Sequence, residues 1–75
     1  MGRKEQLERA LIAAGYEVES NIYGLNVRNS AGQYAVEIEI GGSQFMVYNL
    51  ANDSQTMCSS IASVVSTVRE YIGRK

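Results

Sequence analysis

The chain has 75 residues, 45% of them hydrophobic and 20% charged, and its formal net charge is −1. These values are typical of a globular domain and exclude an intrinsically disordered chain. A core this small leaves a net stability of only about 3–5 kcal/mol. We therefore expect one small domain over residues 1–75, for which burial against a partner matters energetically.

Signals for membrane insertion or secretion are missing from the sequence. No apolar run approaches the roughly 20 residues of a membrane-spanning helix. The basic segment "MGRKEQLERA" is not followed by the apolar stretch of a signal peptide. Cys58 is the only cysteine, which excludes an internal disulfide. A cytoplasmic protein with no membrane contact is the expectation.

A first helix is predicted over residues 3–14, because apolar residues recur at helical spacing along this segment. Gly15 stands where a residue in the left-handed conformation ends a helix. Tyr16 then follows as the residue that packs back on Leu11 in a Schellman motif. Beyond this helix, "YEVES" is either a short separate strand or a bulged extension of the next one.

Two strands are predicted next, over residues 23–28 and 34–40, because apolar and polar residues alternate there. The segment "NSAG" between them has the composition of a hairpin loop. Closing the hairpin at this point pairs Leu25 with Val36. The side chains expected to face the core are Tyr23, Leu25, Val27, Tyr34, Val36, Ile38 and Ile40.

A third strand is predicted in "QFMVYNL", after a glycine-rich turn. A two-residue loop, either 41–42 or 42–43, directs Phe45 and Val47 to the core and Met46 and Tyr48 to the opposite face. A three-residue loop would reverse these orientations.

A second helix is predicted from a cap at Asn52 and Asp53 to Gly73. Its apolar stripe holds Met57, Cys58, Ile61, Val64, Val65, Val68, Tyr71 and Ile72. Cys58 is thus expected to be a buried structural thiol. The predicted fold class is α+β: a two-layer sandwich in α-β-β-β-α order, with a three-stranded antiparallel meander and both helices on one face.

Catalytic and metal-binding patterns are missing. The chain has no histidine, the commonest general base and metal ligand. Glu37 and Glu39 stand two residues apart on one strand face, but nothing in the sequence supplies the desolvation or the metal that would tune them for acid–base chemistry. No glycine-rich segment matches a phosphate-binding loop. We expect no enzymatic activity, no cofactor and no metal.

The predicted order of elements resembles that of the double-stranded RNA-binding domain, a likeness of topology alone. That family places a lysine cluster at the start of its last helix, where this chain has "NDSQTM" and no cation. The terminal cations Arg3, Lys4, Arg74 and Lys75 form a basic patch only if the two ends of the chain are neighbours. Solvated tails are the simpler interpretation, and nucleic-acid binding is the weaker alternative.

Protein binding is the expected activity, because nothing in the predicted fold covers the outer face of the sheet. Met46 and Tyr48 point to this face, and both residue types are enriched at interfaces. Glu37 and Glu39 lie on the same face. Ile12 lies off the apolar stripe of the first helix and is a further candidate for contact.

The polar side of the second helix raises a separate question. In "MCSSIASVVSTV" this side presents Ser59, Ser63 and Ser66 and no charge, although Lys and Glu are better suited to exposed helix positions. Small hydroxyl side chains allow a second copy or another protein to dock closely. A solvated face and packing by the first helix are the alternatives.

From these features we expect a small adaptor, or an inhibitor that occludes a larger complex by protein–protein contact. Compact proteins without catalytic motifs are common among phage and mobile-element products, including anti-CRISPR-type inhibitors. Small size and missing motifs are what this chain shares with them. The alternatives are a nucleic-acid-binding domain and a small homodimeric structural or regulatory protein.

Overall fold

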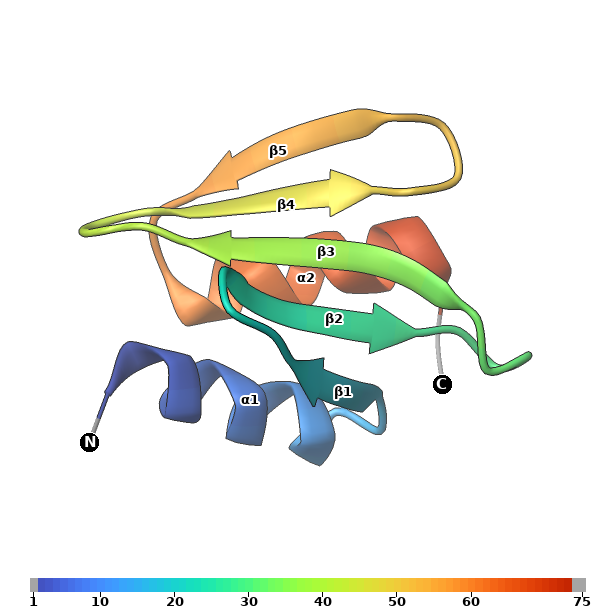
Figure 1. Ribbon diagram of the computed structural model, residues 1–75, viewed down its shortest axis with the longest axis horizontal. Coiled ribbons are helices and arrows are strands. Elements are labelled where there is room, and N and C mark those ends of the chain that lie inside the picture. The colour runs from blue at the N-terminus through green and yellow to red at the C-terminus, as the bar shows by residue number, and fades with distance from the viewer. Residues whose placement is uncertain (1, 74–75) are drawn as a thin grey trace.

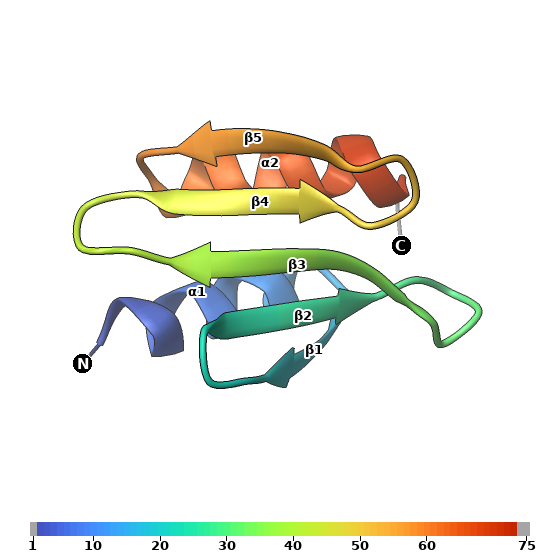
Figure 2. The same ribbon diagram turned by 45° about the horizontal axis from the view of Figure 1, so that its top comes forward.

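The computed structural model describes residues 2–73 of the chain. Over these residues the elements are α1 (Arg3–Ala13), β1 (Glu17–Ser20), β2 (Gly24–Arg28), β3 (Tyr34–Ile40), β4 (Phe45–Asn49), β5 (Ser54–Cys58) and α2 (Ile61–Ile72). The five strands form one antiparallel sheet in which each strand pairs with its neighbour in sequence. Figure 1 and Figure 2 show both helices on the same side of this sheet, with α1 against β1 and β2 and α2 against β3, β4 and β5.

The predicted α+β class is confirmed, but the three-stranded meander is wrong, because the sheet has five strands. One of the additional strands is β1, which makes "YEVES" a short separate strand paired with β2. The other is β5, which occupies the segment predicted as the first turns of the second helix.

The residues read as a helix cap at 52–53 instead form the turn between β4 and β5. The Asn52 Oδ1 atom accepts a hydrogen bond from the Ser54 N–H at 3.0 Å, and the Asn49 Oδ1 atom accepts one from Ala51 at 3.0 Å. Asp53 adopts a positive φ of 61°, which ends any helical path. The helix begins later, where the Ser60 side chain accepts a hydrogen bond from the Ser63 N–H at 3.1 Å.

The end of α1 follows the sequence prediction. The Tyr16 N–H donates to the Leu11 carbonyl at 3.1 Å, and the Gly15 N–H donates to the Ile12 carbonyl at 2.9 Å. Gly15 has a φ of 97°, a conformation that costs glycine little. These are the two hydrogen bonds of a Schellman motif, and they turn Tyr16 into the core beside Leu11.

The β2–β3 hairpin turns in the predicted segment, but its register differs from the prediction, and the Asn29 N–H closes the loop by donating to the Gln33 carbonyl at 2.8 Å. Asn29 organises the loop, because its side-chain oxygen accepts hydrogen bonds from the Ala31 and Gln33 N–H groups at 2.9 and 3.1 Å. Leu25 pairs with Ile38 rather than with Val36. Because both registers keep the same alternation, Leu25, Val27, Val36 and Ile38 are all buried as predicted.

Two aromatic side chains that were predicted to face the core are instead exposed. A bulge between Val27 and Arg28 places Tyr34 opposite Arg28, and Tyr34 is 50% exposed. Tyr23 lies in the turn before β2 and is 62% exposed. The Asn21 side chain holds that turn by accepting hydrogen bonds from the N–H groups of Tyr23 and Gly24 at 2.7 and 2.8 Å.

The β3–β4 connection confirms the second of the two predicted loops. Ile40 pairs with Phe45, and the Gly41 N–H donates to the Gln44 carbonyl at 2.9 Å, so Gly42 and Ser43 form the two-residue loop. Phe45 therefore points into the core, and Met46 points to the opposite face, as predicted.

The core lies between the inner face of the sheet and the two helices. The helices contribute Leu7, Leu11, Val64 and Val68, and the strands contribute Leu25, Val27, Val36, Ile38, Phe45, Val47 and Cys58. Cys58 is buried as predicted, although it lies on a strand. Met57 is not part of the core, because strand alternation turns it to the outer face, where it is 55% exposed opposite Met46. Thr67 of α2 is buried as well, and its Oγ1 atom donates to the Ser63 carbonyl at 2.8 Å.

The cations in the first turn of α1 hold two loops rather than forming a solvated tail. The Arg3 Nη1 atom donates to the carbonyls of Gly41, at 2.8 Å, and Gly42, and its guanidinium carbon lies 4.4 Å from the centre of the Phe45 ring. The Lys4 Nζ atom donates to the Asn21 carbonyl at 2.9 Å. Arg74 and Lys75 lie outside the described residues, so the choice between a basic patch and a solvated tail stays a prediction for these two cations.

Candidate functional site

The candidate site is the outer face of the sheet, which neither helix covers (Figure 2). Residues directly opposite each other on adjacent strands point to the same side of a sheet. One row across the strands consists of Glu19, Asn26, Glu37, Tyr48 and Gln55. The next row consists of Gly24, Glu39, Met46 and Met57. The structure thus brings four predicted contact residues together, namely Glu37, Glu39, Met46 and Tyr48.

A shallow hollow of about 310 Å³ lies over the middle of this face. Its lining residues are Tyr23, Glu37, Glu39, Tyr48, Asn49, Leu50 and Asp53. We call the set Tyr23, Glu37, Glu39, Met46, Tyr48 and Leu50 the acidic–aromatic patch. Carboxylates and large apolar or aromatic side chains alternate within it, so the patch offers both charge and hydrophobic area.

The charge of the patch acts on Tyr48. The Tyr48 hydroxyl donates to the Glu39 Oε1 atom at 3.4 Å. Partial burial raises the pKa of Tyr48, and the neighbouring Glu39 carboxylate raises it further. A phenol is protonated at neutral pH even with its ordinary pKa of about 10, so Tyr48 donates this hydrogen bond there, and the raised pKa extends the protonated range to higher pH.

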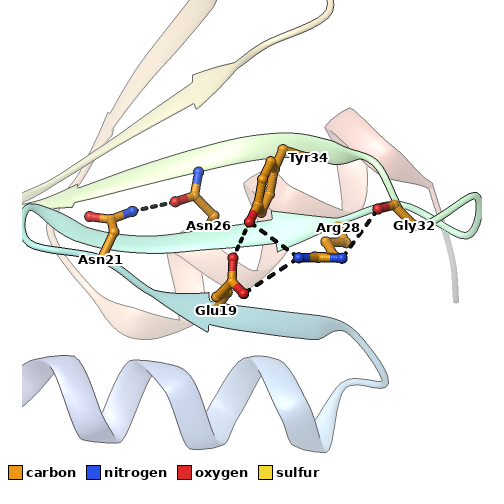
Figure 3. A network of polar contacts seen from close by, with 6 residues as sticks. All are labelled: Glu19, Asn21, Asn26, Arg28, Gly32 and Tyr34. Carbon is orange, nitrogen blue, oxygen red and sulfur yellow. Dashed lines mark hydrogen bonds and ion pairs between the residues drawn. The ribbon is translucent and has the colours of Figure 1, made fainter.

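The cation on this face, Arg28, is engaged with its neighbours (Figure 3). Its Nη2 atom lies 3.4 Å from Glu19 Oε2 and 3.1 Å from the Tyr34 hydroxyl, and its guanidinium carbon lies 4.7 Å from the centre of the Tyr34 ring. The Tyr34 hydroxyl also donates to the Glu19 carboxylate. Arg28 therefore neutralises Glu19 and leaves the charges of Glu37 and Glu39 without a cationic partner among the described residues.

The Glu19 carboxyl gives a direct test of this network. The hydrogen bond from Tyr34 and then the charge of Arg28 lower the pKa of Glu19 below its ordinary value of 4.5. A lowered pKa stabilises the fold above the ordinary value, and this contribution is lost as the pH falls through the folded-state pKa. Tyr34→Phe is expected to raise the pKa of Glu19 and to shrink this acid-dependent loss of stability.

A carbon-detected NMR titration of the Glu19 carboxyl measures the shift, and urea unfolding between pH 3 and pH 7, about the range in which carboxyls titrate, measures the linked stability. Tyr48→Phe is the matched control, because its hydroxyl bonds to Glu39 instead. An unchanged Glu19 pKa in Tyr34→Phe would contradict the assignment.

The remaining predicted contact residues lie elsewhere. Ile12 is exposed on α1 and lines a hollow with Tyr16 and residues of β1, away from the acidic–aromatic patch. Ser63 and Ser66 are exposed on α2, and their role as a docking face stays a prediction. Ser59 is not on the helix, because it lies in the turn before the Ser60 cap.

Sequence reasoning missed two members of the acidic–aromatic patch, Tyr23 and Leu50. The alternation of Leu25 and Val27 extends to Tyr23, which predicts that Tyr23 begins the strand and faces the core. A signal for the turn was present in "SNIYG", since Asn followed by Gly three residues later is typical of a tight turn. Leu50 was read as the end of a strand, whereas it lies in the turn after β4.

Comparisons with models of protein families, with curated proteins and with solved structures found no match to this chain. The fold by itself defines the class: a small α+β domain in which one helix is followed by five strands and then by a second helix. Between residues 2 and 73, no cluster of three or more Cys, Asp or Glu residues has the arrangement of a metal site. Neither α1 nor α2 is long and apolar enough to cross a membrane.

Proposed function

We propose that the chain is a non-enzymatic protein-binding module whose acidic–aromatic patch docks on a basic surface of a larger protein complex. The observation that carries this proposal is the position of Glu37 and Glu39 on the side of the sheet that lacks helices. Arg28, the cation on β2, is bound to Glu19 and Tyr34 instead.

Charge complementarity favours a cationic partner. Within the patch, Glu37 and Glu39 carry negative charge, and Asp53 lies at the rim of the same hollow. Unlike charges across an interface speed association and exclude partners of the wrong sign. A partner that presents Lys or Arg side chains therefore gains from this face, and the phosphate backbone of a nucleic acid is repelled by it.

The apolar members of the patch supply the contact area. Tyr48 and Met46 are half-buried and flank Glu39, while Tyr23 and Leu50 are more exposed. A tyrosine ring stacks on an arginine side chain with an energy of about 0.5–2 kcal/mol. Arginine is accordingly the residue that best fits the hollow, because it combines charge with a flat guanidinium.

Occlusion is the mechanism by which so small a module would act. The domain has no predicted catalytic group, so its effect on a partner would come from covering a surface that other molecules use. An origin in a phage or mobile element and a cytoplasmic location belong to this proposal, and they rest on the small size, the missing motifs and the single cysteine.

The experiment is an affinity capture from the cells in which the protein is naturally made, followed by binding measurements on the captured partner. The double variant Glu37→Lys/Glu39→Lys is expected to weaken binding by at least about 30-fold, because the loss of one partner of a charge pair buried at an interface costs about 2–5 kcal/mol. Binding of the unmodified protein is expected to weaken with rising salt.

The matched control is Glu5→Lys/Glu8→Lys on α1, which changes the net charge by the same amount at one exposed and one half-buried position. This control should retain the partner. A partner that binds the Glu37/Glu39 variant as tightly as the unmodified protein, with circular dichroism showing that both are folded, would exclude the patch as the binding surface.

A further inference from the structure

Besides the outer face of the sheet, the edge of the sheet at β5 is a candidate surface for binding a partner. β5 is the last strand in the sheet order, so one side of its backbone pairs with β4, and on the other side no strand from residues 2–73 lies beside it (Figure 1). Residues 54–57 are all exposed. An edge strand of this kind presents a row of backbone N–H and C=O groups that can pair with another strand.

The two edges of the sheet differ in how they are protected. Proteins shield edge strands by keeping them short or by placing charges, prolines or bulges on them. β1 is four residues long and two of these are glutamates, Glu17 and Glu19. β5 has the sequence SQTMC, with no charge and no proline, and its register with β4 runs without a bulge. Only β5 is therefore open to strand pairing.

The surface beneath the β5 edge is also uncharged. A hollow of about 370 Å³ lies between β5 and α2, and its α2 side is formed by Ala62, Ser63, Ser66 and Thr67. These short side chains leave room for a second helix to approach. The serine-rich side of α2 thus lies beside the open edge of the sheet.

We propose that two copies of the chain pair through β5, in antiparallel orientation, to form a continuous ten-stranded sheet. Antiparallel pairing of identical strands requires a two-fold axis perpendicular to the sheet. Such an axis keeps the faces aligned, so all four helices lie on one side and each α2 meets its copy. Pairing the whole of β5 places Thr56 opposite Thr56 of the second copy, and Gln55 opposite Met57.

The residues at this edge fit a second copy better than an unrelated strand. Near a two-fold axis each side chain meets its own copy, so a charged side chain would face a like charge. A hydroxyl is both donor and acceptor and can bond to an identical hydroxyl. Ser63 and Ser66 meet this requirement, the Thr56 hydroxyl is held by a hydrogen bond with the Tyr71 hydroxyl of its own α2, and the absence of charge along β5 removes self-repulsion. The pairing uses the sheet edge and not the acidic–aromatic patch, so it is independent of the proposed function.

The test is the mass in solution, measured by light scattering between about 1 µM and about 1 mM, the range of weak to moderate affinities. The unmodified chain is expected to approach twice its mass of 8.2 kDa as concentration rises. Gln55→Glu/Met57→Glu places carboxylates opposite each other in both outward cross-strand pairs, and this variant is expected to remain a monomer.

Gln55→Lys/Met57→Glu is the matched control at the same two positions. In the proposed register it places Lys opposite Glu in both pairs, so the dimer is expected to persist or to tighten. Circular dichroism checks that each variant is folded. A monomer at every concentration overturns the proposal, as does a dimer that survives the two glutamates. Dissociation by both double variants overturns the register centred on Thr56.

Discussion

Replacing Gly24 with alanine is expected to remove most of the stability of the fold. A Cβ atom at this position would lie 2.0 Å from the carbonyl oxygen of Ile38 and 3.1 Å from its carbonyl carbon. Both atoms belong to the backbone of β3, so no side-chain rotation relieves the clash and β2 must move away. We expect the free energy of unfolding to fall by about 3 kcal/mol, close to the whole stability of about 3–5 kcal/mol expected for a domain of this size.

Urea unfolding followed by circular dichroism measures this effect. Gly42→Ala is the matched control, because a Cβ atom there meets nothing within 4 Å. Its effect should stay within about 0.5 kcal/mol, as for most surface substitutions. Equal urea midpoints for the two alanine variants would show that β2 and β3 do not approach as closely as described.

Phe45→Ala is expected to cost about 3–5 kcal/mol, the usual range for removing a buried aromatic side chain. The Phe45 side chain is 2% exposed and pairs across the sheet with Ile40 and Cys58. Its ring also carries the Arg3 guanidinium, which binds the carbonyls of the β3–β4 loop. Removing the ring thus opens a cavity and loosens the attachment of α1.

Thermal unfolding of the variant, compared with Met57→Ala and Phe45→Leu, separates these contributions. Met57 lies on the exposed face, so its truncation should change stability by only about 0.5 kcal/mol. Phe45→Leu keeps the site apolar and fills most of the volume of the ring, so its loss of stability should lie between those of Met57→Ala and Phe45→Ala. A Phe45→Ala variant as stable as Met57→Ala would mean that Phe45 does not point into the core.

The middle of the fold was predictable because local signals agree there. In "YAVEIEI" the alternation of apolar and polar residues is strict from Val36 to Ile40, and turn residues bound it on both sides. The orientation of Phe45 and Met46 then followed from the loop length alone. The Schellman motif at Gly15 was predictable for the same reason. Gly15 adopts the left-handed conformation that ends the helix, and Tyr16 supplies the side chain that packs back into the core.

β5 was not predictable from its own residues. An edge strand is packed on one side only, so the sequence SQTMC needs no clear alternation and shows none. The adjacent Asn52 and Asp53 are equally common in turns and at helix starts, and the apolar stripe of α2 can be extended backward to Met57 at helical spacing. Pairing with β4 decides between the two structures, and that interaction is not visible in a local window.

The error in the hairpin has a different cause. The alternation assigned Tyr34 to the core, but a single extra residue at the bulge reverses the direction of every side chain before it. Arg28 and Glu19 then hold the tyrosine on the outer face. The candidate site was predicted better than this strand end, because Glu37, Glu39, Met46 and Tyr48 all lie beyond the bulge.

The connection of every strand to its immediate successor determines how the polypeptide assembles. Each pair of neighbouring strands is joined by a short loop, so little conformational entropy is lost when the two strands come together. The sheet can therefore grow by successive hairpin additions, a route associated with rapid folding kinetics. The meeting of α1 with α2 joins segments from opposite ends of the described chain, so the final docking of these helices is the step that bears the largest closure cost.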